Sequence, residues 1–317
     1  MMKRTSSQGP VVDFFIVGSA KSGSTALYSY LSDHPDVFLP AHKEPNFFAT
    51  DFPNMGGRIK TLEEYEGLYD LCKPGQSAGD ASICCLPSRN AAVDIREYNP
   101  EARIIMLLRD PIEQFISSHS QMLFSYYEDV TSPIEAWRMQ KARAEGRSVP
   151  KSCREPEALQ YKKACSHGMN VERFLEVFPD DRIHIIFFED FCGSSAGTYR
   201  STLAFLELKD DGRVDFPPVN QAKTHARNAL TRLLISPPGP LGRMHAGLRT
   251  WIATTRTPVG RWIEDGARKL LATQSTKRTE KKALSPEERE EILSELRPDI
   301  ELLEKITSRD LSSWKRP

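Results

Sequence analysis

The stretch GSAKSGST, residues 18–25, decides the fold of this chain. The apolar run VVDFFIVG (residues 11–18) precedes it, and the segment from Ser24 to Asp33 follows it with apolar residues at helical spacing. A buried strand, a glycine turn and a helix in this order direct backbone N–H groups onto an anion. In the triphosphate-binding loop G-x-x-x-x-G-K-[ST], lysine follows the second glycine. Here Ser24 stands at that position, and Lys21 lies inside the loop.

Two later segments repeat the pattern of a strand followed by a helix. The apolar run Ile104–Leu108 precedes Pro111, a residue that is favoured in the first turn of a helix. Ile183–Phe188 is a third apolar run, and helices are expected near residues 62–69 and 88–98. Strands that alternate with helices predict an α/β fold, with a P-loop-like central parallel sheet flanked by helices.

The chain has 317 residues, and we expect them to form a single domain. Residues 10–218 would form the α/β core, and residues 219–317 a basic loop and a helical region. The sequence SPEE at 285–288 combines an N-cap hydroxyl, a first-turn proline and acids near the positive end of the helix dipole. A helical cap folded onto the sheet is therefore expected at the C-terminus, with a separate small domain as the alternative.

Charge and hydropathy exclude several classes of protein. Lysines and arginines number 43, as do aspartates and glutamates, so the net charge gives no support to a nucleic-acid binder. No apolar stretch of the sequence approaches the length of a membrane span, so none is expected. The first residues lack the apolar core of a secretory signal, and we expect a cytoplasmic protein. The oligomeric state cannot be inferred from the sequence.

The loop is rich in groups that bind phosphate. Ser22, Ser24 and Thr25 carry hydroxyls, Lys21 carries a mobile positive charge, and the amides of Ser22 and Gly23 are available. A triphosphate loop also needs a partner for magnesium, and no apolar strand is expected to end in aspartate. The loop is therefore expected to bind a phosphate-like group without a metal, and a P-loop kinase or NTPase is the alternative.

Three motifs within residues 18–119 resemble those of the sulfotransferases that use 3′-phosphoadenosine 5′-phosphosulfate (PAPS), and with the segments FPDDRIHIIFFEDF and LRPDIELLEKITSRDLSSW the resemblance extends over nearly the whole chain. GSAKSGSTAL, from residue 18, is similar to the 5′-phosphosulfate loop of that family. RIIMLLRDPIEQFISSH, from residue 103, resembles its 3′-phosphate motif, with Arg109 and Ser117 at the expected spacing. KEPNFF, residues 43–48, resembles the lysine-glutamate-proline motif of bacterial members of the heparan-sulfate and carbohydrate branch.

The resemblance implies a set of donor-binding residues. Lys21 would stabilise the charge on the leaving phosphate, and Ser22, Gly23, Ser24 and Thr25 would hold the 5′-phosphate. The 3′-phosphate would be bound by Arg109 and Ser117, joined by Lys223 and Arg227 of the basic stretch NQAKTHARN; a solvated face is the alternative for that stretch. The product would be 3′-phosphoadenosine 5′-phosphate (PAP), and no metal would be required.

The resemblance also implies how the acceptor is activated. Glu44 matches the catalytic glutamate of the family, and His42 is the alternative base, because two residues that lie two apart in an extended segment share a face. Lys43, Asp80 and Ser82 are the candidates for contacts with the substrate. The acceptor would be a carbohydrate, a glycolipid or a small metabolite with a hydroxyl or amine. A nucleotide-binding scaffold without catalysis is a further alternative.

Overall fold

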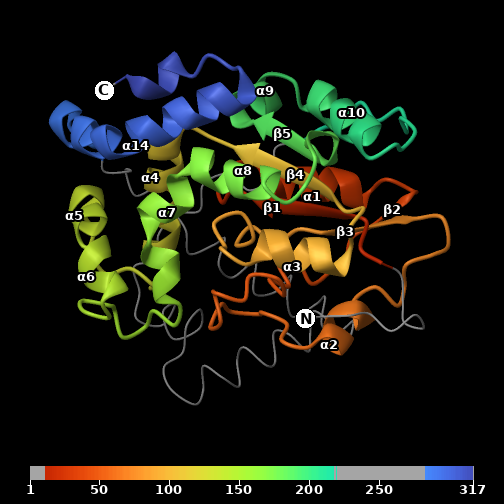
Figure 1. Cartoon of the computed structure of the whole chain (residues 1–317), viewed down its shortest axis with the longest axis horizontal. Helices are drawn as coiled ribbons and strands as arrows, with labels where there is room; N and C mark the ends of the chain where they lie inside the picture. The colour runs from red at the N-terminus through yellow and green to blue at the C-terminus, as the bar shows by residue number, and fades with distance from the viewer. Residues whose placement is uncertain (1–10, 218, 220–282, 317) are drawn as a thin grey trace.

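The computed structural model describes residues 11–217, 219 and 283–316, and in this part of the chain five parallel strands form one sheet (Figure 1). Their order across the sheet is β2-β3-β1-β4-β5. The strands are β1 (Phe14–Gly18), β2 (Val37–Phe38), β3 (Ser77–Asp80), β4 (Arg103–Leu108) and β5 (Ile183–Phe187). The expected parallel sheet with flanking helices is therefore confirmed. Because β1 lies at the centre, the loop that follows it opens at the middle of the carboxyl edge.

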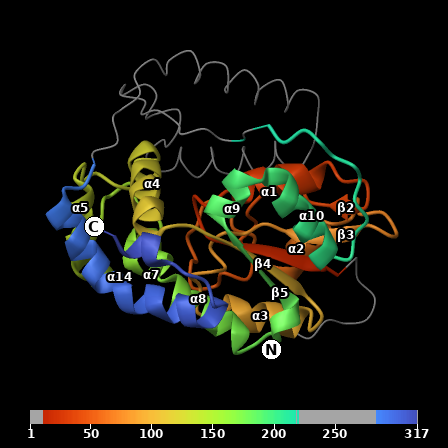
Figure 2. The same cartoon turned by 90° about the horizontal axis from the view of Figure 1, so that it is seen from above.

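Alternate residues of the central strands build two separate cores. Phe14 and Ile16 of β1 point to one face, where they pack with α1 (Ser24–Ser32) and α10 (Ser195–Phe205). Phe15 and Val17 point to the other face, toward the helices α3 (Ala91–Tyr98) and α8 (His167–Leu175). Figure 2 shows the sheet between these two layers. Burial on both faces explains why the strands appear in the sequence as continuous apolar runs.

The remaining helices surround this sandwich. They are α2 (Leu62–Gly67), α3 (Ala91–Tyr98), α4 (Pro111–Phe124), α5 (Pro133–Arg138), α6 (Gln140–Ala144), α7 (Tyr161–Cys165), α8 (His167–Leu175), α9 (Phe188–Gly193) and α14 (Pro286–Thr307), with short 3₁₀ turns at 156–159, 180–182 and 312–315. The expected helix at the C-terminus is α14. Its cap is the expected one, because Ser285 and Glu288 form a reciprocal capping box.

The expected elements differ from the structure at several boundaries. The third apolar run stops being a strand at Phe187, because Phe188 already begins α9. The helix expected from residue 88 begins at Ala91, because the Ser88 hydroxyl accepts the N–H groups of Asn90 and Ala91. The strands β2 and β3 were not expected from the sequence. Both are short, and β3 (SAGD) has small residues in place of an apolar run.

A buried ion pair joins α6 to the segment that precedes α5. Arg143 donates two hydrogen bonds of 2.6 Å to the two oxygens of Glu128, and both side chains are fully buried. The Tyr161 hydroxyl donates a further hydrogen bond of 2.9 Å to the same carboxylate. The pKa of Glu128 is lowered, because these hydrogen bonds outweigh the opposing effect of burial. The fork geometry satisfies both charges inside the protein.

Candidate active site

The glycine loop after β1 has three residues in the left-handed region: φ is 147° at Gly18, 65° at Lys21 and 93° at Gly23. Gly23 is the N-cap of α1, and a Cβ there would lie 2.8 Å from the Phe191 ring. Glycine is therefore required on conformational and on steric grounds. The Ser22 hydroxyl is buried against the Ser19 hydroxyl, 2.5 Å away. The loop thus leads the chain directly into the N-terminus of α1, where anions are stabilised.

Lys43 connects this loop to the KEPN segment. Its Nζ donates to Thr25 Oγ1 at 3.2 Å and to Glu44 Oε1 at 2.7 Å. Thr25 occupies the position of the Ser or Thr that holds magnesium in the triphosphate loop. A lysine ammonium therefore lies where the loop of a kinase would present its divalent cation. This contact could not be inferred from the spacing of the two residues in the sequence.

The backbone around Glu44 forms a tight turn. Glu44 and Asn46 both have positive φ, 63° and 50°, and the Asn46 side-chain amide donates to the Glu44 carbonyl at 2.9 Å. The expectation that His42 and Glu44 share one face of an extended segment is therefore wrong. The His42 ring instead lies 2.9 Å from the Gly57 carbonyl, while Glu44 pairs with Lys43. The two candidate bases have different surroundings, and the choice between them stays a prediction.

Asp80 lies at the end of a strand that the sequence did not predict. It is the last residue of β3, a short strand of small residues, and lies beside Phe15 of β1. Its side chain is only 1% exposed and accepts a 2.9 Å hydrogen bond from the Tyr65 hydroxyl, while Oδ1 has no partner among the described residues. Burial raises the pKa of Asp80 to about 6, against the opposing hydrogen bonds of Ser82 and Tyr65, and the nearby charge of Glu44 raises it further.

Ser82 lies behind the turn that carries Glu44. It is 2% exposed, and its Oγ accepts the backbone N–H of Asn46 at 2.9 Å. Ser82 therefore supports the turn that carries Glu44 from within, while Asp80 is bonded to Tyr65. Their expected contact with the acceptor stays a prediction.

Arg109 follows β4 and reaches back to the glycine loop. Its Nη1 donates to the Lys21 carbonyl at 3.1 Å, and its guanidinium lies 4.7 Å from the centre of the Phe188 ring. Nη2 is 3.7 Å from a carboxylate oxygen of Glu113. Ser117 is one turn beyond Glu113 on α4, so it faces the same side. Arg109 thus contacts the loop, and Ser117 lies on the same face of α4 as its partner Glu113.

His167 is a contact of Arg109 that the sequence did not reveal. It begins α8, is 1% exposed, and its Nε2 is 2.9 Å from the Arg109 carbonyl. Since a carbonyl can only accept, Nε2 carries the hydrogen. Burial lowers the pKa of His167 to about 4, so the ring is neutral at pH 7. A histidine at a helix start carries no signal for this role, because its partner is a backbone atom far along the chain.

Some expectations cannot be placed. Lys223 and Arg227 lie outside the described residues. Within the described ranges, no three or more His, Cys, Asp or Glu side chains gather in a way that could hold a metal ion, and the expected metal-free reaction stays a prediction. No helix in the described part of the chain combines the length and apolarity needed to cross a bilayer.

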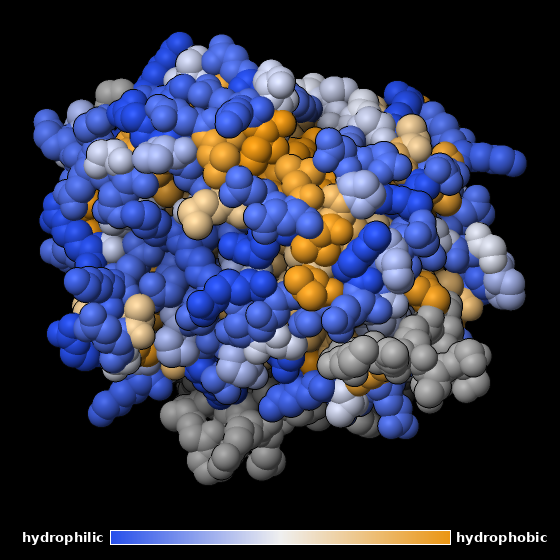
Figure 3. All heavy atoms as spheres, viewed as in Figure 1, coloured by the Kyte–Doolittle hydropathy of each residue, from blue (hydrophilic) through white to orange (hydrophobic). Residues whose placement is uncertain are grey.

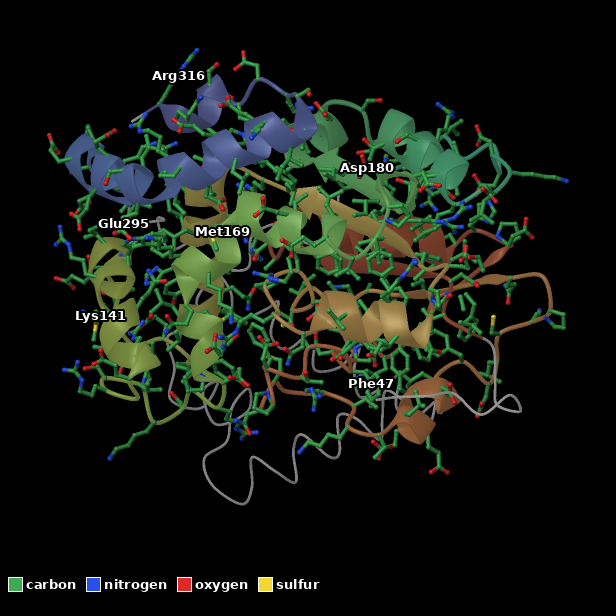
Figure 4. The ribbon with its side chains drawn as sticks, viewed as in Figure 1. Phe47, Lys141, Met169, Asp180, Glu295 and Arg316 are labelled. Atoms are coloured by element: carbon green, nitrogen blue, oxygen red, sulfur yellow. The ribbon has the colours of Figure 1, made fainter. Side chains whose placement is uncertain are left out.

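A hollow of about 490 Å³ lies apart from the glycine loop, beside α8 and α14. Figure 4 shows Lys141, Met169 and Glu295 around it, and Figure 3 shows hydrophobic side chains gathered over α8 on this face. Five basic residues line it: Arg138, Lys141, Lys162, Lys163 and Arg173. Four of them are already bonded to carboxylates or backbone carbonyls: Arg138 to Glu291, Lys162 to Glu295, Lys163 to Glu157 and Arg173 to the Leu86 carbonyl. Its positive charge is therefore largely compensated, and the glycine loop remains the candidate site.

Comparison with known proteins identifies the family. The family model described as "Sulfotransferase domain" matches residues 12–216, from β1 to beyond α10. The chain belongs to the sulfotransferase family. The resemblance seen in the three motifs is thereby confirmed. The helix α14 lies outside the matched residues.

Relatives and solved structures agree with this assignment. The chain is 27% identical to mouse heparan sulfate glucosamine 3-O-sulfotransferase 3B1 over 61% of its length, and 27% identical to the membrane-associated sulfotransferase kil1 of Dictyostelium discoideum over 39%. It spans 45% and 26% of these two proteins, less than half of either. The crystal structure of a sulfotransferase from Alicyclobacillus acidocaldarius shares the fold, with a TM-score of 0.68, 23% identity, and 96% and 98% of the two chains covered.

Proposed function

We propose that this protein transfers a sulfuryl group from PAPS to a hydroxyl or amine of a carbohydrate or another hydroxylated acceptor. The observation that carries the proposal is the position of Lys43, whose ammonium contacts both Thr25 of the glycine loop and Glu44. A cation fixed at this point joins the phosphate loop to a carboxylate that can accept a proton. A kinase-like alternative would need that position for magnesium.

The residues of the loop fit a phosphosulfate. The segment 18–25 contains hydroxyls, backbone amides and a lysine but no carboxylate, so it presents only groups that favour an anion. The close approach of Gly23 to Phe191 keeps the loop backbone free of a side chain at the entrance to α1. PAPS, when bound, supplies a sulfuryl group on a phosphate that leaves as an oxyanion.

The reaction follows from the groups around that phosphate. Glu44 accepts the proton of the acceptor hydroxyl, the acceptor oxygen forms the new S–O bond, and the bond between sulfur and the bridging phosphate oxygen breaks. Lys21 stabilises the charge that develops on this oxygen, so PAP leaves with the electron pair. Lys43 holds Glu44 and Thr25 in one arrangement, which keeps base and donor at a fixed separation. The 3′-phosphate is assigned to Arg109 and Ser117.

The relatives favour a glycan acceptor. Those named above include a heparan sulfate glucosamine 3-O-sulfotransferase, and mouse carbohydrate sulfotransferase 15 is 24% identical over 62% of this chain, which spans 43% of that protein. The KEPN turn places Glu44 beside Lys43, so a basic lysine already occupies one side of the base. An acceptor hydroxyl would therefore approach from the opposite side of the carboxylate.

The test is transfer of radiolabelled sulfate from PAPS to a panel of amino sugars, oligosaccharides, glycolipids and small alcohols. We expect labelled product with the wild type and a loss of about 10²–10⁴-fold in turnover with Glu44→Gln. Glu63→Gln, at an exposed glutamate of α2, is the matched control and should keep full activity. Magnesium-dependent ATP turnover without any sulfate transfer would reject the proposal in favour of the kinase-like alternative.

A further inference from the structure

The helix α14 makes an ion-pair contact with the turn that carries Arg109. Arg289, in its first turns, places Nη2 3.6 Å from Asp110 Oδ2 and Nη1 3.8 Å from Glu113 Oε1. Glu113 is the carboxylate that also pairs with Arg109. One carboxylate is therefore shared by two guanidinium groups, one from the sheet edge and one from α14. Figure 1 shows α14 lying across α4 and α8.

The helix α14 also contacts α8, and α8 in turn bonds the backbone of Arg109. The Asp299 carboxylate accepts the backbone N–H groups of Gly168 and Met169, both at 2.9 Å, and so caps the start of α8. A Cβ at Gly168 would lie 2.4 Å from the Asp299 carbonyl, so the two helices are in direct contact there. The residue before this cap is His167, which bonds the Arg109 carbonyl. His167 of α8 thus fixes the backbone of Arg109, and Arg289 of α14 contacts Glu113, the carboxylate that pairs with the Arg109 side chain.

We propose that α14 positions Arg109 for the 3′-phosphate of the donor, with Arg289 and Asp299 as positioning residues. The inference rests on the proposed function, because it takes Arg109 as the 3′-phosphate ligand. It gives a role to a helix that lies outside the residues matched by the family model.

The physical reason is competition for Glu113. The Glu113 carboxylate would repel an incoming phosphate, and it also pairs with the Arg109 guanidinium, which is proposed to bind that phosphate. Arg289 offsets that negative charge from the opposite side, so Arg109 can turn from Glu113 to the phosphate. Without Arg289, Glu113 would bind Arg109 more tightly and would repel the phosphate more strongly.

The experiment compares binding of PAP and AMP by calorimetry, because the two nucleotides differ only in the 3′-phosphate. In Arg289→Ala we expect the Kd for PAP to rise about twofold to fivefold, the range that partly exposed ion pairs span, with little change for AMP. Arg297→Ala is the matched control, because Arg297 lies on the same helix and pairs with Glu290 instead. It should leave both constants unchanged.

A second substitution separates charge competition from general damage to the fold. Glu113→Gln removes the competing charge, so it should tighten PAP alone and should restore PAP binding when combined with Arg289→Ala. Asp299→Asn, which weakens the cap of α8, should also affect PAP more than AMP. Thermal unfolding of each variant shows whether it is folded.

Three outcomes would overturn the inference. An unchanged ratio of PAP to AMP affinity in folded Arg289→Ala would reject it and leave the proposed function intact. If Arg289→Ala does not fold, the single variant Glu113→Gln decides, and a failure to tighten PAP would reject the inference. Equal binding of PAP and AMP by the wild type would instead reject the assignment of the 3′-phosphate to Arg109, and the inference with it.

Discussion

The buried carboxylate of Asp80 makes the stability of this protein depend on pH in a direction that is unusual for an acid. Burial raises the pKa of Asp80 to about 6, while the unfolded chain would have the ordinary value, near 3.8. Below both values the residue is protonated in both states and has no effect. As pH rises from the lower value to the higher one, the unfolded state releases its proton first. The native state therefore loses stability over this window and does not regain it at higher pH.

The size of the effect follows from the difference between the two pKa values. Each unit corresponds to about 1.4 kcal/mol, so ionised Asp80 costs about 3 kcal/mol once the pH is well above 6. Asp80→Asn removes the charge but keeps an oxygen that can accept the hydrogen bond of Tyr65. The stability of the variant relative to the wild type should therefore increase by about 2 kcal/mol between about pH 4.5 and about pH 7.5.

Thermal unfolding across this range measures the effect. In a chain of 317 residues the expected change corresponds to a relative Tm shift of about 3 °C in favour of Asp80→Asn at the higher pH. Asp310→Asn is the matched control, because the hydrogen bonds of Ser312 hold the pKa of Asp310 below its usual value. Asp310 is therefore ionised in both the folded and the unfolded state across this range, and its variant should differ from the wild type by an almost constant amount. A difference between wild type and Asp80→Asn that stays constant with pH would refute the conclusion that burial keeps this carboxyl protonated.

Three further predictions concern the chemistry and the core. Lys21→Ala should lower the rate of sulfate transfer by about 10²–10³-fold, while calorimetry shows a modest change in PAP affinity, because the variant lacks the ammonium that stabilises the charge developing on the leaving oxygen in the transition state. In the same transfer assay His42→Gln should retain most of the wild-type activity, whereas Glu44→Gln should lose it. If His42→Gln instead lost more activity than Glu44→Gln, His42 would be the base. Arg143→Met should destabilise the protein by about 3–5 kcal/mol in urea unfolding, because Glu128 is left buried and unpaired; a loss below about 1 kcal/mol would contradict this.

The sequence predicts the parts of the fold that depend on long apolar runs. β1 is buried throughout and β4 is buried after Arg103, and strands buried on both faces must be apolar. The edge strand β5 is buried only at Ile186 and Phe187, but its run of apolar residues still makes it visible in the sequence. β3 escaped prediction because contact with β1 sets its composition. A Cβ at Gly79 would lie 2.2 Å from the Phe14 ring, so the strand has to be small where β1 is bulky. A requirement of this kind belongs to a pair of strands and cannot be seen in either one alone.

The same distinction separates the predictable part of the site from the rest. The loop of residues 18–25 is local, and its glycines and hydroxyls are visible as a pattern. The placement of Glu44 depends on a turn whose backbone N–H at Asn46 is bound by Ser82, 36 residues later in the chain. Lys43, just before this turn, contacts Thr25 of the loop. Glu44 has a positive φ, so Glu44 and His42 do not share one face as they would in an extended segment. A hydrogen bond from a residue far along the chain contributes to this turn, and this is why the sequence could name both candidate bases but could not choose between them.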